Sequence, residues 1–247
     1  MDNNKSKPVN ESRLKDARLV MDFFHRMTIH HAMWFAEVKK HMGPAKAYKA
    51  LNEVYGKSTE IQLKRLSKVL GFEMHEGVPE PFLQLDEEIL DKLKESMAVN
   101  WLANDGIWFQ AVEFSENMDV AKKCNDSCWA EFSPFEAWSI KRLLDMSDNP
   151  GLEGLKQALN YRFYSFVNKQ SISDETNRSF IFSMNDCRVQ SARKRKGLND
   201  YPCKSAGIIE YTSFAEAIDP RIRTSCIGCP PDKHPDEWFC SWKFSID

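Results

Sequence analysis

The chain has 247 residues, of which 42% are hydrophobic, including 16 Phe and 7 Trp, so a large buried core is expected. The formal net charge of −2 argues against nucleic-acid binding through bulk electrostatics. No apolar run approaches the roughly 18 residues of a membrane span, and residues 1–12 lack the apolar segment of a signal peptide. We therefore predict a cytoplasmic protein with no membrane or nucleic-acid partner. Its seven cysteines are expected to be reduced thiols or metal ligands.

Helical periodicity dominates the first two thirds of the chain. Residues 1–10 are polar and are predicted to form a disordered tail. Gly43, Gly56 and Gly71 are placed to end helices, and residues 72–84 have the glycine and proline content of a linker. The predicted helices cover residues 12–41, 44–55, 58–70, 86–115, 118–131, 134–146 and 151–168.

The helical part looks duplicated. HHAMWFAEV at residues 30–38 matches NDGIWFQAV at residues 104–112, with an offset of 74. LKRLSKVL at residues 63–70 matches IKRLLDM further on, with an offset of 77. Two repeat halves, residues 11–71 and 86–146, are one interpretation, and two unrelated aromatic helices are the other.

The last third of the chain changes in character. Short runs with β-branched or aromatic residues predict strands at residues 179–184, 207–211, 222–226 and 239–246. TSFAEAID, residues 212–219, predicts a short helix. In FCSWKF the alternation predicts that Cys240, Trp242 and Phe244 share a buried face. The expected fold class is α+β: a duplicated helical region, residues 11–170, packed on a cysteine-rich unit with a small antiparallel sheet, residues 171–247.

His31 lies in the middle of an apolar helical stripe, and Asp105 occupies the equivalent place in the second repeat. An unpaired carboxylate on an apolar face is costly, so Asp105 is expected to have a partner. The two residues could line one cavity as ligand-binding, acid/base or metal-binding groups. The alternative is a buried hydrogen bond that sets the helix register.

CIGCPPDKHPDEWFC holds three cysteines and a histidine within residues 226–240. Cys226 and Cys229 have the CxxC spacing that lets two thiolates bind one metal, and His234 and Cys240 complete a candidate zinc or iron site. The alternative is that Cys240 is a core residue. A thioredoxin-like redox pair is less favoured, because the motif has no βαβ context and prolines follow it.

Four more residues are candidates for a site. Arg188 begins RVQSARKRKG, which is either an anion-binding loop or a solvated turn. Glu210 and Asp219 are candidate general bases, although Asp219 before Pro220 is also an ordinary turn residue, and Arg221 is a candidate ligand-binding residue. No P-loop and no GxGxxG motif is present, so no nucleotide cofactor is expected.

Residues 185–244, which begin NDCRVQ and end FCSWKF, resemble two groups of proteins. One is the 4-vinyl-reductase-like small-molecule-binding domains, and the other is the L-2-amino-thiazoline-4-carboxylate hydrolase-like family. The whole chain, HHAMWFAEV included, resembles an uncharacterised prokaryotic "cytosolic protein" family. These resemblances imply a ligand pocket in the C-terminal unit, lined by Cys187, Cys203 and Cys240.

The expected function is therefore binding of a small molecule, together with a metal such as zinc or iron, in the cysteine-rich unit. The alternative is a metal- or thiol-dependent hydrolase of a small C–N or C–S substrate, with Cys187 and Cys203 as nucleophile or ligands and Glu210 or Asp219 as base. A helical scaffold for homo-oligomer formation is a third interpretation.

Overall fold

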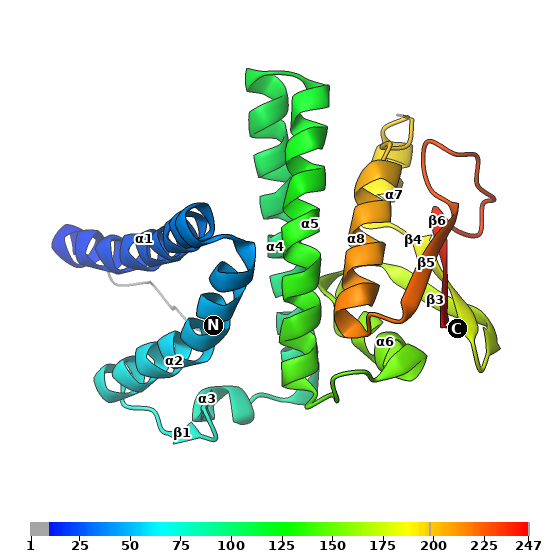
Figure 1. The fold of residues 1–247 in the computed structure, drawn as a ribbon. Helices are drawn as coiled ribbons and strands as arrows, with labels where there is room; N and C mark the ends of the chain where they lie inside the picture. Colours follow the sequence, from blue (N-terminus) through cyan, green and yellow to red (C-terminus); the bar gives the residue numbers. More distant parts are fainter. Residues whose placement is uncertain (1–9, 198, 247) are drawn as a thin grey trace, which may run out of the picture. The chain divides into compact units, whose positions relative to one another are not determined.

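The computed structural model describes residues 10–197 and 199–246, which fold as two compact units divided between Leu85 and Asp86. Figure 1 follows the elements along the chain. Helices and one four-stranded antiparallel sheet make this an α+β protein, as predicted. Among the described residues, no helix combines the length and apolar character needed to cross a membrane.

The first unit consists mainly of two long helices, α1 (Glu11–Met42) and α2 (Pro44–Leu70). Gly43, with φ of 82°, ends α1 and lets Pro44 start α2, as the sequence indicated. A short hairpin, β1 (Met74–His75) with β2 (Val78–Pro79), and helix α3 (Glu80–Leu83) follow within the predicted linker.

The prediction that a helix ends at Gly56 was wrong, because α2 runs through it without a break. One glycine inside a helix costs only about 1 kcal/mol, and the Thr59 hydroxyl donates to the Tyr55 carbonyl across that turn at 3.0 Å. Gly71, with φ of 76°, has the left-handed conformation that ends the helix.

The second unit begins with two long helices, α4 (Glu87–Ser115) and α5 (Met118–Leu143). The prediction of a break before Pro134 was wrong, because α5 continues through this proline. A proline removes one helical hydrogen bond, but tertiary packing supplies most of the stability of a helix in a protein. Ser133, Glu136, Ala137 and Ile140 are all buried around this point, so packing holds the helix on both sides of Pro134.

Shorter helices complete the helical part of the second unit. They are α6 (Gly151–Leu159), the 3₁₀ turn η1 (Phe163–Phe166), α7 (Arg188–Arg195) and α8 (Lys204–Ile218). Residues 207–211 were wrongly predicted as a strand, and the RVQSARKRKG segment, expected to be a loop or a turn, is mostly the helix α7. In α8, Gly207, Tyr211 and Phe214 are buried with helical spacing, which a five-residue window does not reveal.

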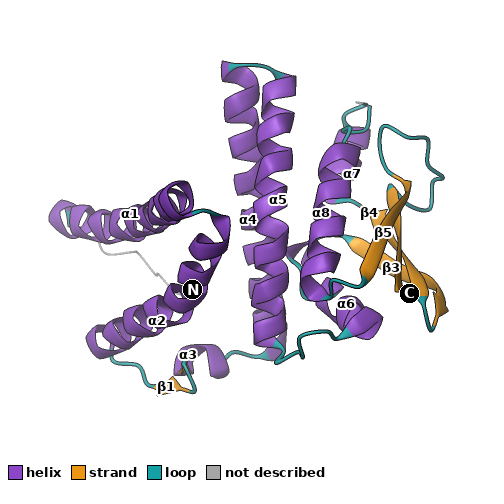
Figure 2. Ribbon diagram, in the orientation of Figure 1, coloured by secondary structure: helices purple, strands orange, loops and turns teal. Residues whose placement is uncertain are grey.

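The sheet is built from β3 (Lys169–Thr176), β4 (Ser179–Asp186), β5 (Ile222–Gly228) and β6 (Cys240–Ile246), all antiparallel in the order β3-β4-β6-β5. Three of these strands were predicted, and β3 was not. Cys240, Trp242 and Phe244 are buried, as FCSWKF predicted, and Ser241 on the opposite face of the strand is buried as well. Helix α8 packs against the sheet, α5 packs on α8, and α4 packs on α5 (Figure 2).

The two helical hairpins carry grooves at equivalent places. Eight residues line the groove of α1 and α2, and each has a counterpart 74 positions later in a groove of α4 and α5. The first set is His31, Trp34, Phe35, Val38, Ala47, Ala50, Leu51 and Val54, and the second is Asp105, Trp108, Phe109, Val112, Ala121, Cys124, Asn125 and Cys128. Such a correspondence is what a duplication of one hairpin produces.

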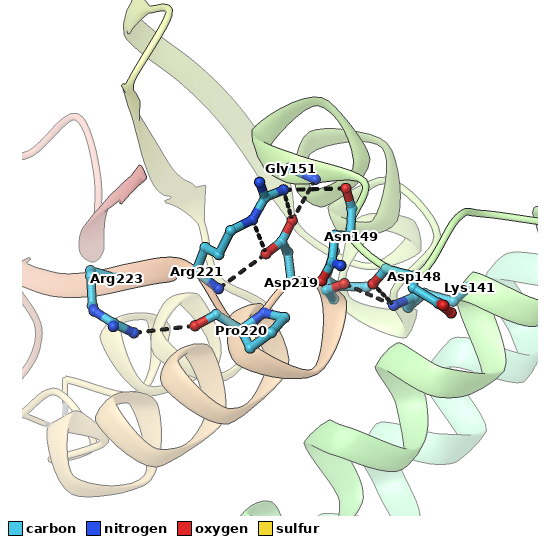
Figure 3. Close-up of polar contacts among 9 residues, drawn as sticks. Lys141, Asp148, Asn149, Gly151, Asp219, Pro220, Arg221 and Arg223 are labelled. Carbon is cyan, nitrogen blue, oxygen red and sulfur yellow. Dashed lines mark hydrogen bonds and ion pairs between the residues drawn. The ribbon is translucent and has the colours of Figure 1, made fainter. Parts of the chain in front are cut away.

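Asp219 joins three elements at one end of the second unit (Figure 3). Its carboxylate has no exposed surface and accepts hydrogen bonds from the Gly151 backbone N–H at 2.9 Å and from the Arg221 backbone and guanidinium at 2.7–3.0 Å. Gly151 starts α6, Asp219 ends α8, and Arg221 lies just before β5. Lys141 of α5 reaches the same corner and donates to the Ile218 carbonyl at 2.9 Å.

Replacing Asp219 by alanine is expected to lower the free energy of unfolding by about 1.5–3 kcal/mol at pH 7, because the Gly151 and Arg221 donors lose a buried, charged acceptor. The Arg221 hydrogen bonds hold the pKa of Asp219 at about 2, below its usual 3.8. A lowered pKa stabilises the folded state above pH 4, and this stabilisation is lost as the pH falls towards 2. Urea unfolding of wild type and variant should therefore converge between pH 4 and pH 2. The exposed Asp148 is the control, and Asp148→Ala should change stability by less than about 0.5 kcal/mol.

Candidate functional site

A cavity of about 290 Å³ lies inside the second unit, among α4, α5, α7, α8 and the sheet. At its floor, Trp242, Tyr211 and Cys229 are at most 4% exposed. Gln110 and Met118, which are exposed residues of α4 and α5, lie at its rim. The cavity therefore leads from solvent to the packed face of the sheet.

Aromatic rings form much of the wall. Tyr211 and Trp242 lie with ring centroids 4.7 Å apart, Trp129 stacks on Tyr164 at 5.8 Å, and Phe109 meets Tyr201 edge-on at 5.5 Å. Paired rings in contact have little freedom to collapse into the space beside them. This packing keeps the cavity open.

Four of the seven cysteines line the cavity, at residues 187, 203, 229 and 240. The Sγ atoms of Cys203 and Cys229 are 3.6 Å apart, and the Cys229 thiol also has Cys240 as a hydrogen-bonding neighbour. These residues come from three segments: Cys203 precedes α8, Cys229 follows β5, and Cys240 begins β6. The sequence separation between them shows that the fold, not a local motif, brings the thiols together.

The thiols differ in acidity. A hydrogen bond from Cys229 lowers the pKa of Cys203 against the effect of burial, and Gln190 Nε2 donates to the same sulfur at 3.5 Å. Cys203 is also the N-cap residue of α8, where the helix dipole favours negative charge. Cys229 has its pKa raised, first by the hydrogen bond to Cys203 and then by its contact with Cys240. Burial raises the pKa of Cys187 to about 12. Cys203 is therefore the thiol with most thiolate character.

Glu210 lies at the cavity wall and belongs to a buried charge cluster. Arg162, which is 2% exposed, contacts Glu136 Oε2 at 2.8 Å through Nε and Glu210 Oε1 at 2.7 Å through Nη1. Two carboxylates thus share one guanidinium. Burial raises the pKa of Glu210 to about 7, although Arg162 opposes this shift. A carboxyl group with such a pKa changes charge near neutral pH.

Two donors in the wall have no hydrogen-bond partner among the described residues. They are Trp242 Nε1 and Asn168 Nδ2, and both are shielded from solvent. A buried donor that lacks an acceptor costs about 1–3 kcal/mol, so these groups favour an acceptor atom inside the cavity.

The structure brings several of the sequence candidates together. Cys187, Cys203, Glu210 and Asp105 all line the cavity, and so do Cys229 and Cys240 from the predicted metal set. Burial raises the pKa of Asp105. His31 lies in the groove of the first unit, so it lines a different pocket from Asp105.

Other candidates lie outside the cavity. The Arg221 side chain is 59% exposed and pairs with Asp219. The backbone N–H of Arg188 donates to Asn168, and the cavity is lined by its helix neighbours Val189, Gln190 and Arg193 instead.

Two members of the predicted metal set also lie elsewhere. The imidazole of His234 contacts Asp200 at 2.9 Å and the Pro235 carbonyl at 2.8 Å. Cys226 pairs with Trp242 across the β5–β6 ladder and does not line the cavity. Within residues 10–197 and 199–246, no group of three or more His, Cys, Asp or Glu side chains is arranged to hold a metal ion.

Sequence reasoning missed Gln190, Asn168 and Arg162. Gln190 is 1% exposed and binds the Tyr201 backbone through both its amide oxygen and its amide nitrogen, at 2.8 and 2.9 Å. Its position three residues after Cys187 is a helical spacing that could have indicated a shared face, had the basic segment been recognised as a helix.

A family model matches residues 82–246, which is more than half of the chain and includes every residue that lines the cavity. The chain belongs to this family. It is described as a family of unknown function, DUF6125. Comparisons with curated proteins and with solved structures gave no significant match. The DUF6125 match spans the second unit and only the last four residues of the first, 82–85, so the cavity lies within the part of the chain that the family shares.

Proposed function

We propose that this protein binds a small organic molecule in the thiol-lined cavity of its second unit. The observation that carries the proposal is the pair of buried, unpartnered donors, Trp242 Nε1 and Asn168 Nδ2, in a cavity walled by aromatic rings. Ligand sites combine such an apolar wall with a few polar groups that orient the ligand. The comparisons gave no match to the vinyl-reductase-like or thiazoline-hydrolase-like groups, so the proposal rests on the cavity.

The wall limits the chemistry of the ligand. A volume of about 290 Å³ is at the small end of the range for ligand sites. The rings favour an apolar or aromatic body, and the two free donors favour a carbonyl or hydroxyl oxygen on it. Thiols remain reduced in the cytoplasm, which is the compartment that this proposal assumes. A metal is not part of the proposal, because neither His234 nor Cys226 lines the cavity.

Gly106 of α4 offers a direct test. It lines the cavity, and a Cβ atom built there meets no atom within 4 Å, so a larger side chain has room to enter. We expect 2-naphthol to bind wild type in isothermal titration calorimetry and Gly106→Trp to weaken this binding by about tenfold or more.

Gly106→Ala is the matched control and should bind 2-naphthol like wild type. Equal affinity of the Trp and Ala variants would contradict the proposal, and so would the absence of binding to wild type at millimolar 2-naphthol. Thermal unfolding of both variants checks that they are folded.

A thiol-dependent hydrolase is the second candidate. The observation in its favour is Cys203, the N-cap residue of α8, which accepts a hydrogen bond from Gln190 and lies in hydrogen-bonding contact with the Cys229 thiol. A thiolate held in this way is a nucleophile for a carbon centre in a small C–N or C–S substrate. Glu210, with a pKa of about 7, is the candidate proton-transfer group on the same wall.

A further inference from the structure

We infer that Cys203 and Cys229 form a two-thiol centre that reduces small organic disulfides inside the cavity. The inference rests on the proposed function, because the disulfide must enter the same cavity. It assigns roles that differ from those of the CxxC pair, since Cys226 is not a member and Cys203 lies 26 residues before its partner.

The Cys203 and Cys229 side chains are in contact inside the cavity. The Cys203 and Cys229 sulfurs are 3.6 Å apart, which is van der Waals contact, and both line the cavity. Cys203 is half-buried, whereas Cys229 is 1% exposed. A molecule in the cavity therefore reaches Cys203 while Cys229 stays behind it.

The two thiols have different surroundings. Gln190 Nε2 donates to Cys203 Sγ, the Cys229 thiol can donate to the same sulfur, and Cys203 is the N-cap residue of α8. All three features stabilise a thiolate on Cys203. With Cys203 as the thiolate, the Cys229 thiol is the donor in the pair and keeps its proton. Cys203 is thus the attacking sulfur and Cys229 the resolving sulfur.

The reaction proceeds in two exchanges. The Cys203 thiolate attacks one sulfur of R–S–S–R, forms a Cys203–S–S–R bond and expels RS⁻, which takes the proton of Cys229 and leaves as RSH. The Cys229 thiolate then attacks Cys203 Sγ, forms the Cys203–Cys229 disulfide and expels a second RS⁻. The small disulfide gains two electrons, and the protein dithiol loses two. A small external dithiol restores the protein by the reverse exchanges.

The cavity defines the substrate class. A volume of about 290 Å³ admits a small disulfide but not a protein chain, and the burial of Cys229 keeps protein disulfides from the resolving thiol. A second, adjacent thiol has no use in a site that only binds a ligand, but it is what completes a disulfide reduction.

The test uses 2-hydroxyethyl disulfide and a full-length Cys124→Ser/Cys128→Ser protein, which lacks the two exposed thiols. Mass spectrometry of the intact protein, followed by peptide mapping, should find the Cys203–Cys229 disulfide and release of two probe thiols per chain. Cys229→Ser should stop at one probe half bound to Cys203. Cys203→Ser should lose both products, and Cys226→Ser should react like its parent.

Two results would overturn the inference. One is a parent protein that forms no Cys203–Cys229 disulfide, and the other is a Cys229→Ser variant that traps no adduct on Cys203. Circular dichroism of each variant excludes misfolding, and Cys229→Ala repeats the trapping test with a side chain that cannot donate. Binding of 2-naphthol without formation of the Cys203–Cys229 disulfide would contradict this inference and leave the proposed function intact. Slower exchange in Gly106→Trp than in Gly106→Ala would place the reaction in the cavity, and equal rates would contradict it.

Discussion

Replacement of Arg162 by methionine is expected to lower the free energy of unfolding by about 3–5 kcal/mol at pH 8, because two buried carboxylates lose their shared cation. Glu136 and Glu210 are 6% exposed and both contact the Arg162 guanidinium. Methionine fills much of the apolar space, so the effect reports charge more than volume. Urea unfolding of the second unit, followed by fluorescence, measures it.

The stability that Arg162→Met loses should be larger at pH 8 than at pH 5. In wild type, burial holds the pKa of Glu210 at about 7, above its usual 4.5. A carboxyl group with a raised pKa gives its full stability below pH 4.5, and that stability is lost as the pH rises through 7. Without Arg162 the raised pKa moves higher still, so the variant should recover much of its deficit at pH 5.

Two further variants separate charge from packing. Arg162→Met combined with Glu136→Gln and Glu210→Gln removes all three charges and should restore most of the stability at pH 8. Lys92→Met removes a cation from an exposed pair with Glu88 in α4, and it should cost at most about 1 kcal/mol. A deficit that is the same at pH 5 and pH 8 would show that the cluster does not act through its charges.

The sequence was enough to locate most helices and strands, but not to tell where a helix is interrupted. Helical periodicity located α1 and α4, and short runs of β-branched and aromatic residues located three of the four strands of the larger sheet. Gly56 and Pro134 were taken as breaks on local propensity, and both lie inside continuous helices. Propensity is a weak preference that packing overrides, and the buried residues around Pro134 are not visible in a local window.

The candidate site was predictable by residue type but not by partner. Cys187, Cys203 and Glu210 were named as one group, and the fold places all three on one cavity wall. Spacing in sequence suggested Cys226 as the partner of Cys229, yet the structure places the Cys203 thiol 3.6 Å from that of Cys229. A pair that depends on where a helix meets a sheet cannot be read from CxxC spacing.

Gly207→Ala is expected to destabilise the protein by about 1–3 kcal/mol, because overpacking a filled core forces neighbours out of position. A Cβ at Gly207 of α8 would lie 2.8 Å from Trp242 Cζ2 and 3.6 Å from Cys229 Sγ. Trp242 is 1% exposed and its ring lies against Tyr211, so it has little room to move. Thermal and urea unfolding provide the measurement.

Gly106→Ala is the matched control, because it makes the same change in another helix on the same cavity. A Cβ there meets open space, so relief of the helical cost of glycine should stabilise the protein by about 0.5–1 kcal/mol. The same substitution thus has opposite signs on the two sides of the cavity. If both changes stabilise the protein, α8 is not held tightly against Trp242, and the close approach that places Cys203 beside Cys229 loses its physical basis.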